Sequence, residues 1–380
     1  MKRDTHQIEW INSALKLEHF CESVGTVLAV DTESDHYLSY SPQICLVQAA
    51  TPEHCALIDP FAFTKEELEP FFKLLGDAQV IKLFHAGQND FIEFDRDFGV
   101  EVVHVFDTRI AARFLGYKKT SLDALLLEKL GLEPGPNLQK FDWRTRPLPA
   151  DATGYAASDV VHLFELQSLL EEELEESSWG EPFKQTCAFV AATSRHEERP
   201  FDKEGWRRLK GSNQLRGRNR AILQELFIWR HELCCELNQA AFRVVPNHDL
   251  FGLASQPPAT LEELKKNRRV RRLNSSVLKS LWEAIQSGKS EAAPPAKRRS
   301  VSSEGRATPE EEECVKRLKR WRNREADQLD LPSEFIATND VLLKMARENP
   351  STRAELEETG ILLPWQYDLF GRRLLEIIQA

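Results

Sequence analysis

Several features that would mark a membrane, secreted or nucleotide-hydrolysing protein are missing from this sequence. It has no run of about 18 apolar residues, so no membrane-spanning helix is expected. Residues 1–10 are charged and lack an apolar run, so no signal peptide is expected. The seven cysteines include no Cys-x-x-Cys pair, which argues against a disulfide framework or a zinc ribbon. These absences predict a soluble protein of a reducing compartment, the cytoplasm.

The length and the charge distribution indicate several domains of unlike character. A chain of 380 residues exceeds what one hydrophobic core usually supports. Residues 1–200 have 18 Lys and Arg against 34 Asp and Glu, a net charge of −16, whereas residues 201–380 have 32 against 26, a net charge of +6. This asymmetry favours an acidic catalytic or metal-binding part joined to a basic part that binds phosphate. An acidic surface that only keeps the first part soluble is the alternative.

The second half of the chain contains an internal duplication. Two segments align without gaps at an offset of 92 residues, and the matched positions of the first copy are Trp229, Arg230, Asn247, Leu250, Ala254, Pro258, Thr260, Glu263 and Leu264. Both copies have amphipathic helical patterns, and in each a Thr precedes a Glu by three residues, which predicts a capping-box helix start. The duplication therefore predicts two all-helical bundles, separated by a flexible linker at residues 287–308 that has no apolar periodicity.

The first 178 residues alternate between short β-branched runs and helical patterns. The expected strands are Thr26–Val30, Ile44–Ala49, Ala56–Ile58, Val80–Phe84 and Val102–Phe106. The expected helices are Lys65–Leu75, Asp90–Phe98 closed by Gly99, Ser121–Leu130 closed by Gly131, and a long one from Asp151 to about Glu176. This order predicts a mixed α/β sheet with flanking helices.

Carboxylates stand at the ends of these expected elements. Asp31 and Glu33 are two residues apart on the first strand and so project from one face. Asp90 opens a helix, and Tyr155 and Asp159 are four apart on the last helix, hence on one of its faces. Paired carboxylates repel each other unless a cation lies between them, and hard ions such as Mg²⁺ and Mn²⁺ prefer oxygen ligands. Taken singly, each of these groups is equally compatible with an ordinary solvated side chain or helix-start carboxylate.

The ordered combination resembles a known family. Asp31-x-Glu33, Asp90 in a His-Ala-Gly-x-x-Asp context and Tyr155-x-x-x-Asp159 are similar to the three motifs of the DEDD 3′→5′ exonucleases of the tyrosine subtype. The flanking runs 40–48, 107–108 and 142–148 resemble the ribonuclease D family and the related exosome-associated nuclear exonuclease. The duplicated helical segments resemble HRDC domains, and two of them behind one exonuclease domain match the bacterial ribonuclease D arrangement.

The resemblance implies a role for each matched residue. Asp31, Glu33, Asp90 and Asp159 would bind two divalent metal ions, Mg²⁺ or Mn²⁺, which stabilise the attacking and leaving oxygens of a phosphodiester hydrolysis. Tyr155 would orient the attacking water, because an ordinary tyrosine is too weakly acidic to be a good general base at neutral pH. The product would be a nucleoside 5′-monophosphate. No organic cofactor is implied.

Substrate contacts are less clearly marked. The family has an aromatic residue directly after the Asp-x-Glu pair, where this chain has Ser34, so stacking on the terminal bases would fall to Tyr37 or Phe84. His85 would contact the substrate near the scissile bond, or would simply be satisfied by neighbours at a strand end. A basic run would bind RNA phosphates, or would form a solvated face, and it includes Lys265, Lys266, Arg268 and Arg269.

Together these features predict a metal-dependent 3′→5′ exoribonuclease that matures 3′ ends of tRNA precursors and other structured RNAs. A DNA exonuclease of the Werner or proofreading type and a catalytically dead nucleic-acid-binding adaptor are the alternatives. A helicase is excluded, because the sequence has no Gly-x-x-x-x-Gly-Lys-Ser/Thr phosphate loop. The expected domains are an exonuclease domain at 1–178, a connecting helical segment at 179–208, HRDC-like domains at 209–286 and 309–380, and the linker at 287–308.

Overall fold

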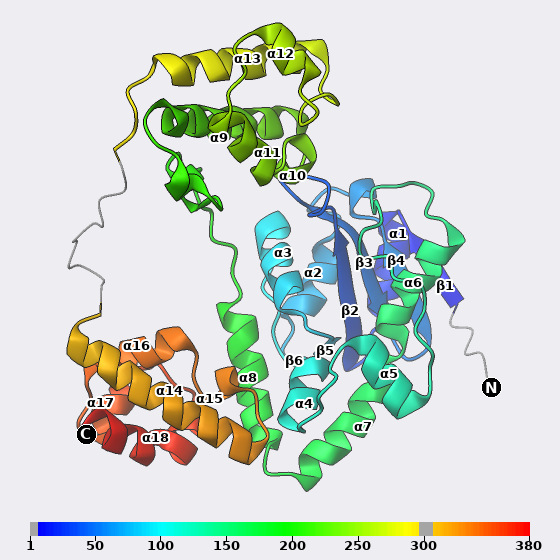
Figure 1. Ribbon diagram of the computed structural model, residues 1–380. Coiled ribbons are helices and arrows are strands. Elements are labelled where there is room, and N and C mark those ends of the chain that lie inside the picture. The colour runs from blue at the N-terminus through cyan, green and yellow to red at the C-terminus, as the bar shows by residue number, and fades with distance from the viewer. Residues whose placement is uncertain (1–6, 296–306) are drawn as a thin grey trace. The chain divides into compact units, whose positions relative to one another are not determined.

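The computed structural model describes residues 7–295 and 307–380 (Figure 1). Part of the predicted linker, residues 296–306, lies outside this range. The described chain divides into two compact units. The first contains the exonuclease region and the last helical segment, and the second contains residues 34–43 and the first helical segment. No helix among the described residues is both long and apolar enough to cross a membrane.

A six-stranded mixed sheet forms the centre of the first unit within the described residues. Its strands lie in the order β1-β4-β3-β2-β5-β6, where β3 and β4 pair antiparallel, and β1 with β4, β2 with β5 and β5 with β6 pair parallel. Their bounds are β1 (Gln7–Ile11), β2 (Val27–Ser34), β3 (Ile44–Ala50), β4 (His54–Ile58), β5 (Ile81–Phe84) and β6 (Val105–Asp107). The mixed sheet confirms the predicted fold class. Strand β1 was not predicted from the sequence, because its residues are mostly exposed and carry no apolar run.

Eight helices accompany this sheet in the described part of the exonuclease region. They are α1 (Ala14–Glu22), α2 (Glu69–Gly76), α3 (Gln88–Phe98), α4 (Thr108–Phe114), α5 (Leu122–Leu130), α6 (Ala150–Val161), α7 (Leu163–Glu176) and α8 (Gly180–Thr193), with a short 3₁₀ turn at Pro60–Ala62. Gly99 and Gly131 end α3 and α5 in the left-handed conformation, as expected of glycine at this position. The predicted long last helix is interrupted at His162, so it is two helices.

The last helical segment packs against the exonuclease region. It consists of α14 (Pro309–Leu329), α15 (Ser333–Ile336), α16 (Asn339–Glu348), α17 (Arg353–Glu358) and α18 (Pro364–Ile378), and Figure 1 shows α8 beside this bundle. The Phe114 ring of α4 lies 4.6 Å from that of Phe335 and 5.7 Å from that of Trp365, centroid to centroid. The amide of Trp365 donates to the Gln185 side chain on α8 at 3.1 Å. The predicted connecting segment therefore contributes to the core, because one face of α8 is buried.

The first helical segment is part of the second unit. It contains α9 (Arg218–Leu237), α10 (Ala241–Val244), α11 (Asn247–Ser255), α12 (Leu261–Lys266) and α13 (Ser275–Ser290), after short 3₁₀ turns at Gly205–Arg208 and Ser212–Gln214. Helix α13 extends four residues into the predicted linker. Gly288 explains this, because a Cβ there would lie 2.5 Å from the Ile222 Cα of α9, so only glycine permits this close helix contact.

Buried arginines show that the sequence duplication is also a structural one. Arg230 donates to the Val245 carbonyl and the Asn247 side chain, both at 2.8 Å. Arg322, 92 residues later, donates to the Ala337 carbonyl at 2.9 Å and to the Asn339 side chain at 3.2 Å. Each bond has its counterpart at the same offset. A buried guanidinium needs such partners, which explains why the Arg and the Asn occur together in both copies.

The predicted helix starts in both copies are formed with a modified pattern. The Thr260 hydroxyl accepts from the Glu263 amide at 3.1 Å, and the Glu263 carboxylate accepts from the Ala259 amide at 2.7 Å. In a strict capping box the carboxylate would bind the amide of the threonine itself. The strict form occurs instead at Thr308 and Glu311, at the start of α14.

Candidate active site

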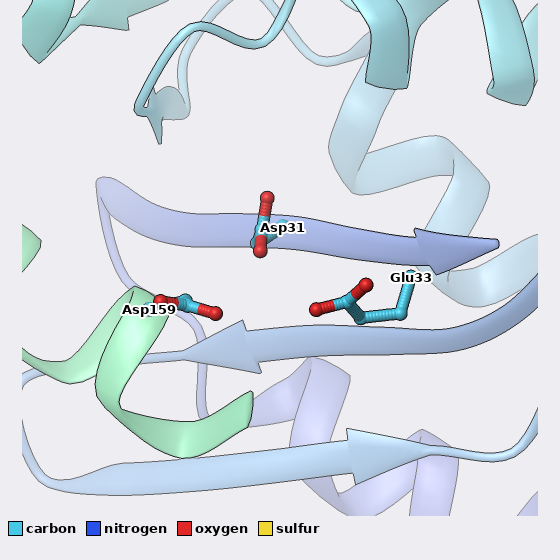
Figure 2. A group of neighbouring side chains, drawn as sticks. All are labelled: Asp31, Glu33 and Asp159. Atoms are coloured by element: carbon cyan, nitrogen blue, oxygen red, sulfur yellow. The ribbon is translucent and has the colours of Figure 1, made fainter. Parts of the chain in front are cut away.

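Three carboxylates from two elements meet at one place. Asp31 and Glu33 project from β2, and Asp159 projects from α6 (Figure 2). One carboxylate oxygen of each lies within 4.8 Å of the others. The strand spacing of two residues brings Asp31 and Glu33 to one face, and the helix supplies the third group across from them.

Asp90 lies beside this group. It is in the first turn of α3 and is 8 % exposed, and its carboxylate accepts a short hydrogen bond from the Thr32 hydroxyl. Thr32 lies between Asp31 and Glu33 on β2, so this bond joins α3 to the strand that carries both acids. The negative charge of Asp90 contributes to raising the pKa of both Asp31 and Glu33. The structure therefore brings Asp31, Glu33 and Asp159 together. It places Asp90 close enough for its charge to affect the pKa of Asp31 and Glu33.

Asp107 positions the turn that leads to Asp90. Its carboxylate accepts from the amides of Ala86 at 3.1 Å and Gly87 at 2.9 Å, and it also caps the start of α4. Ala86 has φ of 64°, a conformation that costs energy for a residue with a Cβ, and these bonds compensate for it. At Gly87 a Cβ would lie 2.8 Å from the Phe84 side chain, so the turn needs glycine there. These contacts account for the Ala-Gly and Asp-Thr runs noted in the sequence.

Burial and mutual repulsion raise the pKa values of the clustered acids. Burial, followed by the charges of Asp90, Asp159 and Glu33, raises the pKa of Asp31 well above its ordinary value. Burial and then the charges of Asp159 and Asp90 raise the pKa of Glu33 to about 9. Burial and then the charge of Asp123 raise the pKa of Asp159 to about 7. Without a cation, the cluster holds protons that ordinary carboxylates would release.

These groups fit a divalent metal ion. They are hard oxygen donors within a few ångströms of one another, and a cation bound among them would replace the protons that their crowding retains. The set has no cysteine or histidine, which a zinc site would favour.

The raised pKa values make the stability of the metal-free protein depend on pH. Folded Glu33 keeps its proton up to about pH 9, whereas an unfolded glutamate releases it near about pH 4.3. Between these values the folded state binds more protons than the unfolded state, so the free energy of unfolding falls as the pH rises. We expect the melting temperature of chelator-treated protein to fall between about pH 5 and pH 9. Thermal melts of the wild type and Glu33→Gln at several pH values measure this dependence. If the melting temperature of both proteins fell equally with pH, the raised pKa of Glu33 would be contradicted.

Tyr155 lies one helical turn before Asp159 and lines the same cleft. Its ring centroid is 6.0 Å from that of the fully buried Trp143. Burial, followed by the charges of Asp159, Glu33 and Asp31, raises the pKa of the Tyr155 hydroxyl above its usual value. The hydroxyl therefore keeps its proton at neutral pH.

The cleft has a volume of about 760 Å³ and is strongly acidic. Six carboxylates of the described residues line it: Asp31, Glu33, Asp123, Glu133, Asp151 and Asp159. Among the described residues that line the cleft, Arg109 is the only lysine or arginine. Thr32, Asp123 and Arg109 were not predicted from the sequence as site residues. Arg109 directly follows the Asp107-Thr108 pair, so that pair was a signal for it, whereas no pattern marked Asp123.

His85 lines the cleft and is also held by a neighbour. Its Nδ1 lies 2.9 Å from the Thr108 hydroxyl, which in turn donates to the Phe84 carbonyl at 3.2 Å. Burial lowers the pKa of His85, an effect that Asp107 opposes and Arg109 reinforces. The ring is therefore neutral at neutral pH, and both interpretations of His85 from the sequence agree with its position.

The aromatic residues considered for base stacking have other partners. Phe84 is fully buried, and its ring contacts that of Phe91 at 4.9 Å, so it has no surface for a base. Tyr37 belongs to the second unit, where its ring lies 5.1 Å from that of Phe242. Ser34 has its hydroxyl 3.0 Å from the His36 Nδ1. Phe84 is thus the wrong candidate, because its strand position points into the core.

The basic run lies at the end of α12 and in the turn after it, in the second unit. Lys265, Lys266 and Arg268 are exposed, and Arg269 is partly buried with its Nε 3.6 Å from the Asp249 carboxylate. Lys265 pairs with Glu262 at 2.7 Å. Exposed pairs of this kind are weak, so most of the positive charge stays available to an anionic partner.

Comparisons with known proteins agree with this geometry. A family model described as 3′-5′ exonuclease matches residues 8–175, and the HRDC domain model matches residues 219–273 and 311–378. Ribonuclease D of Nitrobacter hamburgensis is 28 % identical over 97 % of this chain and 95 % of its own length. Ribonuclease D of Cronobacter turicensis is 34 % identical over 65 % of this chain and 67 % of its own length. The crystal structure of Escherichia coli RNase D covers 98 % of both chains with a TM-score of 0.65 and 25 % identity.

The acidic cluster near the end of β2, together with the matched exonuclease region, defines a 3′-5′ exonuclease. Exonucleases of this fold use divalent metal ions. The chain belongs to the ribonuclease D family, and it is a 3′-5′ exoribonuclease with a helical HRDC-containing C-terminal part.

Proposed function

We propose that this exoribonuclease trims 3′ extensions of structured RNAs such as tRNA precursors, releasing nucleoside 5′-monophosphates. The observation that carries the proposal is the convergence of Asp31, Glu33 and Asp159 in an open cleft large enough for a nucleotide. The related Escherichia coli protein is described as an exoribonuclease involved in structured RNA processing, which supports this substrate class.

Asp31, Glu33, Asp90 and Asp159 are proposed as the ligands of two divalent metal ions, Mg²⁺ or Mn²⁺. When bound, the ions would activate water and stabilise charge on the phosphate oxygens. The protein holds its carboxylates ready on a rigid strand and two helices. Thr32 fixes Asp90 through its hydroxyl, so this carboxylate is oriented before any ion binds.

Tyr155 is proposed to orient the attacking water by donating a hydrogen bond. Burial and the neighbouring carboxylates raise the pKa of the Tyr155 hydroxyl, so the phenol keeps its proton and is able to donate that bond. His85 is proposed as a substrate contact near the scissile bond, since it lines the cleft in a fixed orientation. Tyr37 and the basic run Lys265, Lys266, Arg268 and Arg269 are proposed as more distant RNA contacts.

The domain bounds are part of the proposal. We assign the exonuclease domain to residues 1–178 and the two HRDC-like domains to 209–286 and 309–380. The matched HRDC regions at 219–273 and 311–378 fall inside the latter two. The connecting segment at 179–208 contains α8, which packs with the exonuclease domain.

A cleavage assay tests the proposed function. A 5′-labelled RNA hairpin with a single-stranded 3′ extension should shorten one nucleotide at a time with Mg²⁺ or Mn²⁺, and the released product should be 5′-monophosphate. A chelator should abolish the reaction, and excess metal should restore it. A DNA strand of the same sequence is the control substrate, against which the rate of RNA digestion is compared. Faster digestion of DNA than of RNA, or activity that persists in chelator, would contradict the proposal.

A further inference from the structure

A second cavity adjoins the catalytic cleft within the first unit. Its volume is about 500 Å³, in the range typical of small-ligand sites. Helices α3, α4 and α8 form one wall, and residues of the last helical domain, including Val341 and Leu363, form the other. Ala86 and Arg109 line both this cavity and the catalytic cleft. The two spaces therefore meet at Arg109.

Arg109 is unusual in its electrostatic surroundings. It is exposed, and it is the only lysine or arginine among the described residues lining a cleft with six carboxylates. A polyanionic substrate that enters such a cleft needs a cation to hold its phosphates away from the acids. A guanidinium suits this role because it binds phosphate oxygens through a planar fork of donors.

The other charged groups of the second cavity already have partners. The Asp107 carboxylate accepts hydrogen bonds from four backbone amides, those of Ala86, Gly87, Arg109 and Ile110. Arg113 and Glu334 form an ion pair, and the Arg113 guanidinium also lies 4.6 Å from the Phe335 ring centroid. Arg109 is thus the cation of this cavity that is placed to meet an incoming anion.

An exposed aromatic side chain lines the same cavity. Phe189 on α8 is 51 % exposed, whereas the other phenylalanine of this cavity, Phe335, is 9 % exposed. Nucleic-acid bases stack on such rings without regard to sequence, and each stacked base adds appreciably to affinity. A phosphate donor and a stacking surface in one cavity are the two elements of a single-strand binding subsite.

We propose that this second cavity is a subsite for single-stranded RNA upstream of the scissile bond, in which Arg109 binds an internucleotide phosphate and Phe189 stacks on a base. The inference rests on the proposed function, since it takes the cleft to hold the 3′ end. It also gives the last helical domain a part in substrate binding, because that domain forms the opposite wall.

Kinetics on RNAs of two lengths test the subsite. An octanucleotide reaches the second cavity, whereas a dinucleoside monophosphate has only its scissile phosphate and does not. For the octanucleotide we expect Arg109→Gln to raise KM by about 10- to 100-fold and Phe189→Ala by about 5- to 100-fold. Both increases should be much smaller for the dinucleotide. Arg109→Lys should recover most of the octanucleotide affinity, since it keeps the charge.

Arg372→Gln is the matched control, because Arg372 is 95 % exposed on α18 and lines neither cavity. Its kinetics should equal those of the wild type at both lengths. An equal KM increase at both lengths would place Arg109 at the scissile phosphate and overturn the subsite, as would no increase at either length. Octanucleotide binding measured by fluorescence anisotropy in chelator needs no cleavage. If Arg109→Gln and Phe189→Ala do not weaken this binding, the subsite is wrong. If they weaken it but the wild type does not cleave RNA, the proposed function is wrong and the subsite is not.

Discussion

Asp31→Asn is expected to lower the rate of RNA cleavage by at least about 10³-fold while leaving RNA binding largely intact. Asp31 lies in the close carboxylate group with Glu33 and Asp159, and the charges of Asp90, Asp159 and Glu33 all act on it. Metal ions held by such groups contribute several kcal/mol of transition-state stabilisation. A loss of about 4 kcal/mol corresponds to about 10³-fold in rate. Asparagine is isosteric, so the strand and its neighbours should keep their positions.

Asp151→Asn is the matched control for this substitution. Asp151 lines the same cleft and is exposed, but it is not in the close group of Asp31, Glu33 and Asp159. Its replacement should change cleavage by no more than a few-fold. Single-turnover cleavage measures the rates and fluorescence anisotropy measures RNA binding. Retention of full activity by Asp31→Asn would exclude the metal-binding role, and an equal loss in both variants would point to general electrostatics of the cleft.

Phe114→Ala is expected to lower the free energy of unfolding by about 3–5 kcal/mol, the usual cost of removing a buried phenylalanine side chain. Phe114 is 1 % exposed, and its ring is surrounded by those of Trp179, Phe335 and Trp365. Two of these rings belong to the last helical domain. The substitution therefore opens a cavity in the core that this domain shares with the exonuclease region.

Phe189→Ala is the control for stability, because Phe189 is half-exposed and its truncation leaves no buried cavity. It should change the free energy of unfolding by no more than about 0.5 kcal/mol. Urea unfolding followed by tryptophan fluorescence measures both variants. A loss below about 1 kcal/mol for Phe114→Ala would show that the two domains do not share a packed core.

Local sequence patterns anticipated much of the fold. Strand and helix patterns in the first 178 residues indicated a mixed sheet, and glycines at 99 and 131 marked two helix ends that the structure places there. The offset of 92 residues revealed the helical duplication. In the structure, Arg230 and Arg322 make equivalent hydrogen bonds in the two copies. These features depend on residues close in sequence or on exact repetition, so a linear reading finds them.

Other features could not be found in this way. The run of 287–290 looked like linker because it lacks apolar periodicity, yet it is helical, since Gly288 packs on the backbone of α9. Residues 34–43 directly follow Glu33 but belong to the second unit, where the Tyr40 hydroxyl lies 2.7 Å from the His231 Nδ1. Such contacts join residues about 200 positions apart, and no local pattern encodes them.

The sequence by itself determined the chemical inventory of this protein: the acids, the tyrosine at helical spacing, the basic run and the duplicated helical domain. Only the tertiary structure decided how these parts are used. It put Asp90 on the Thr32 hydroxyl beside the carboxylate group, buried Phe84, and set Arg109 where two cavities meet. The reason is physical: composition and spacing fix what a segment can do, whereas burial, charge environment and neighbours arise only when distant segments pack together.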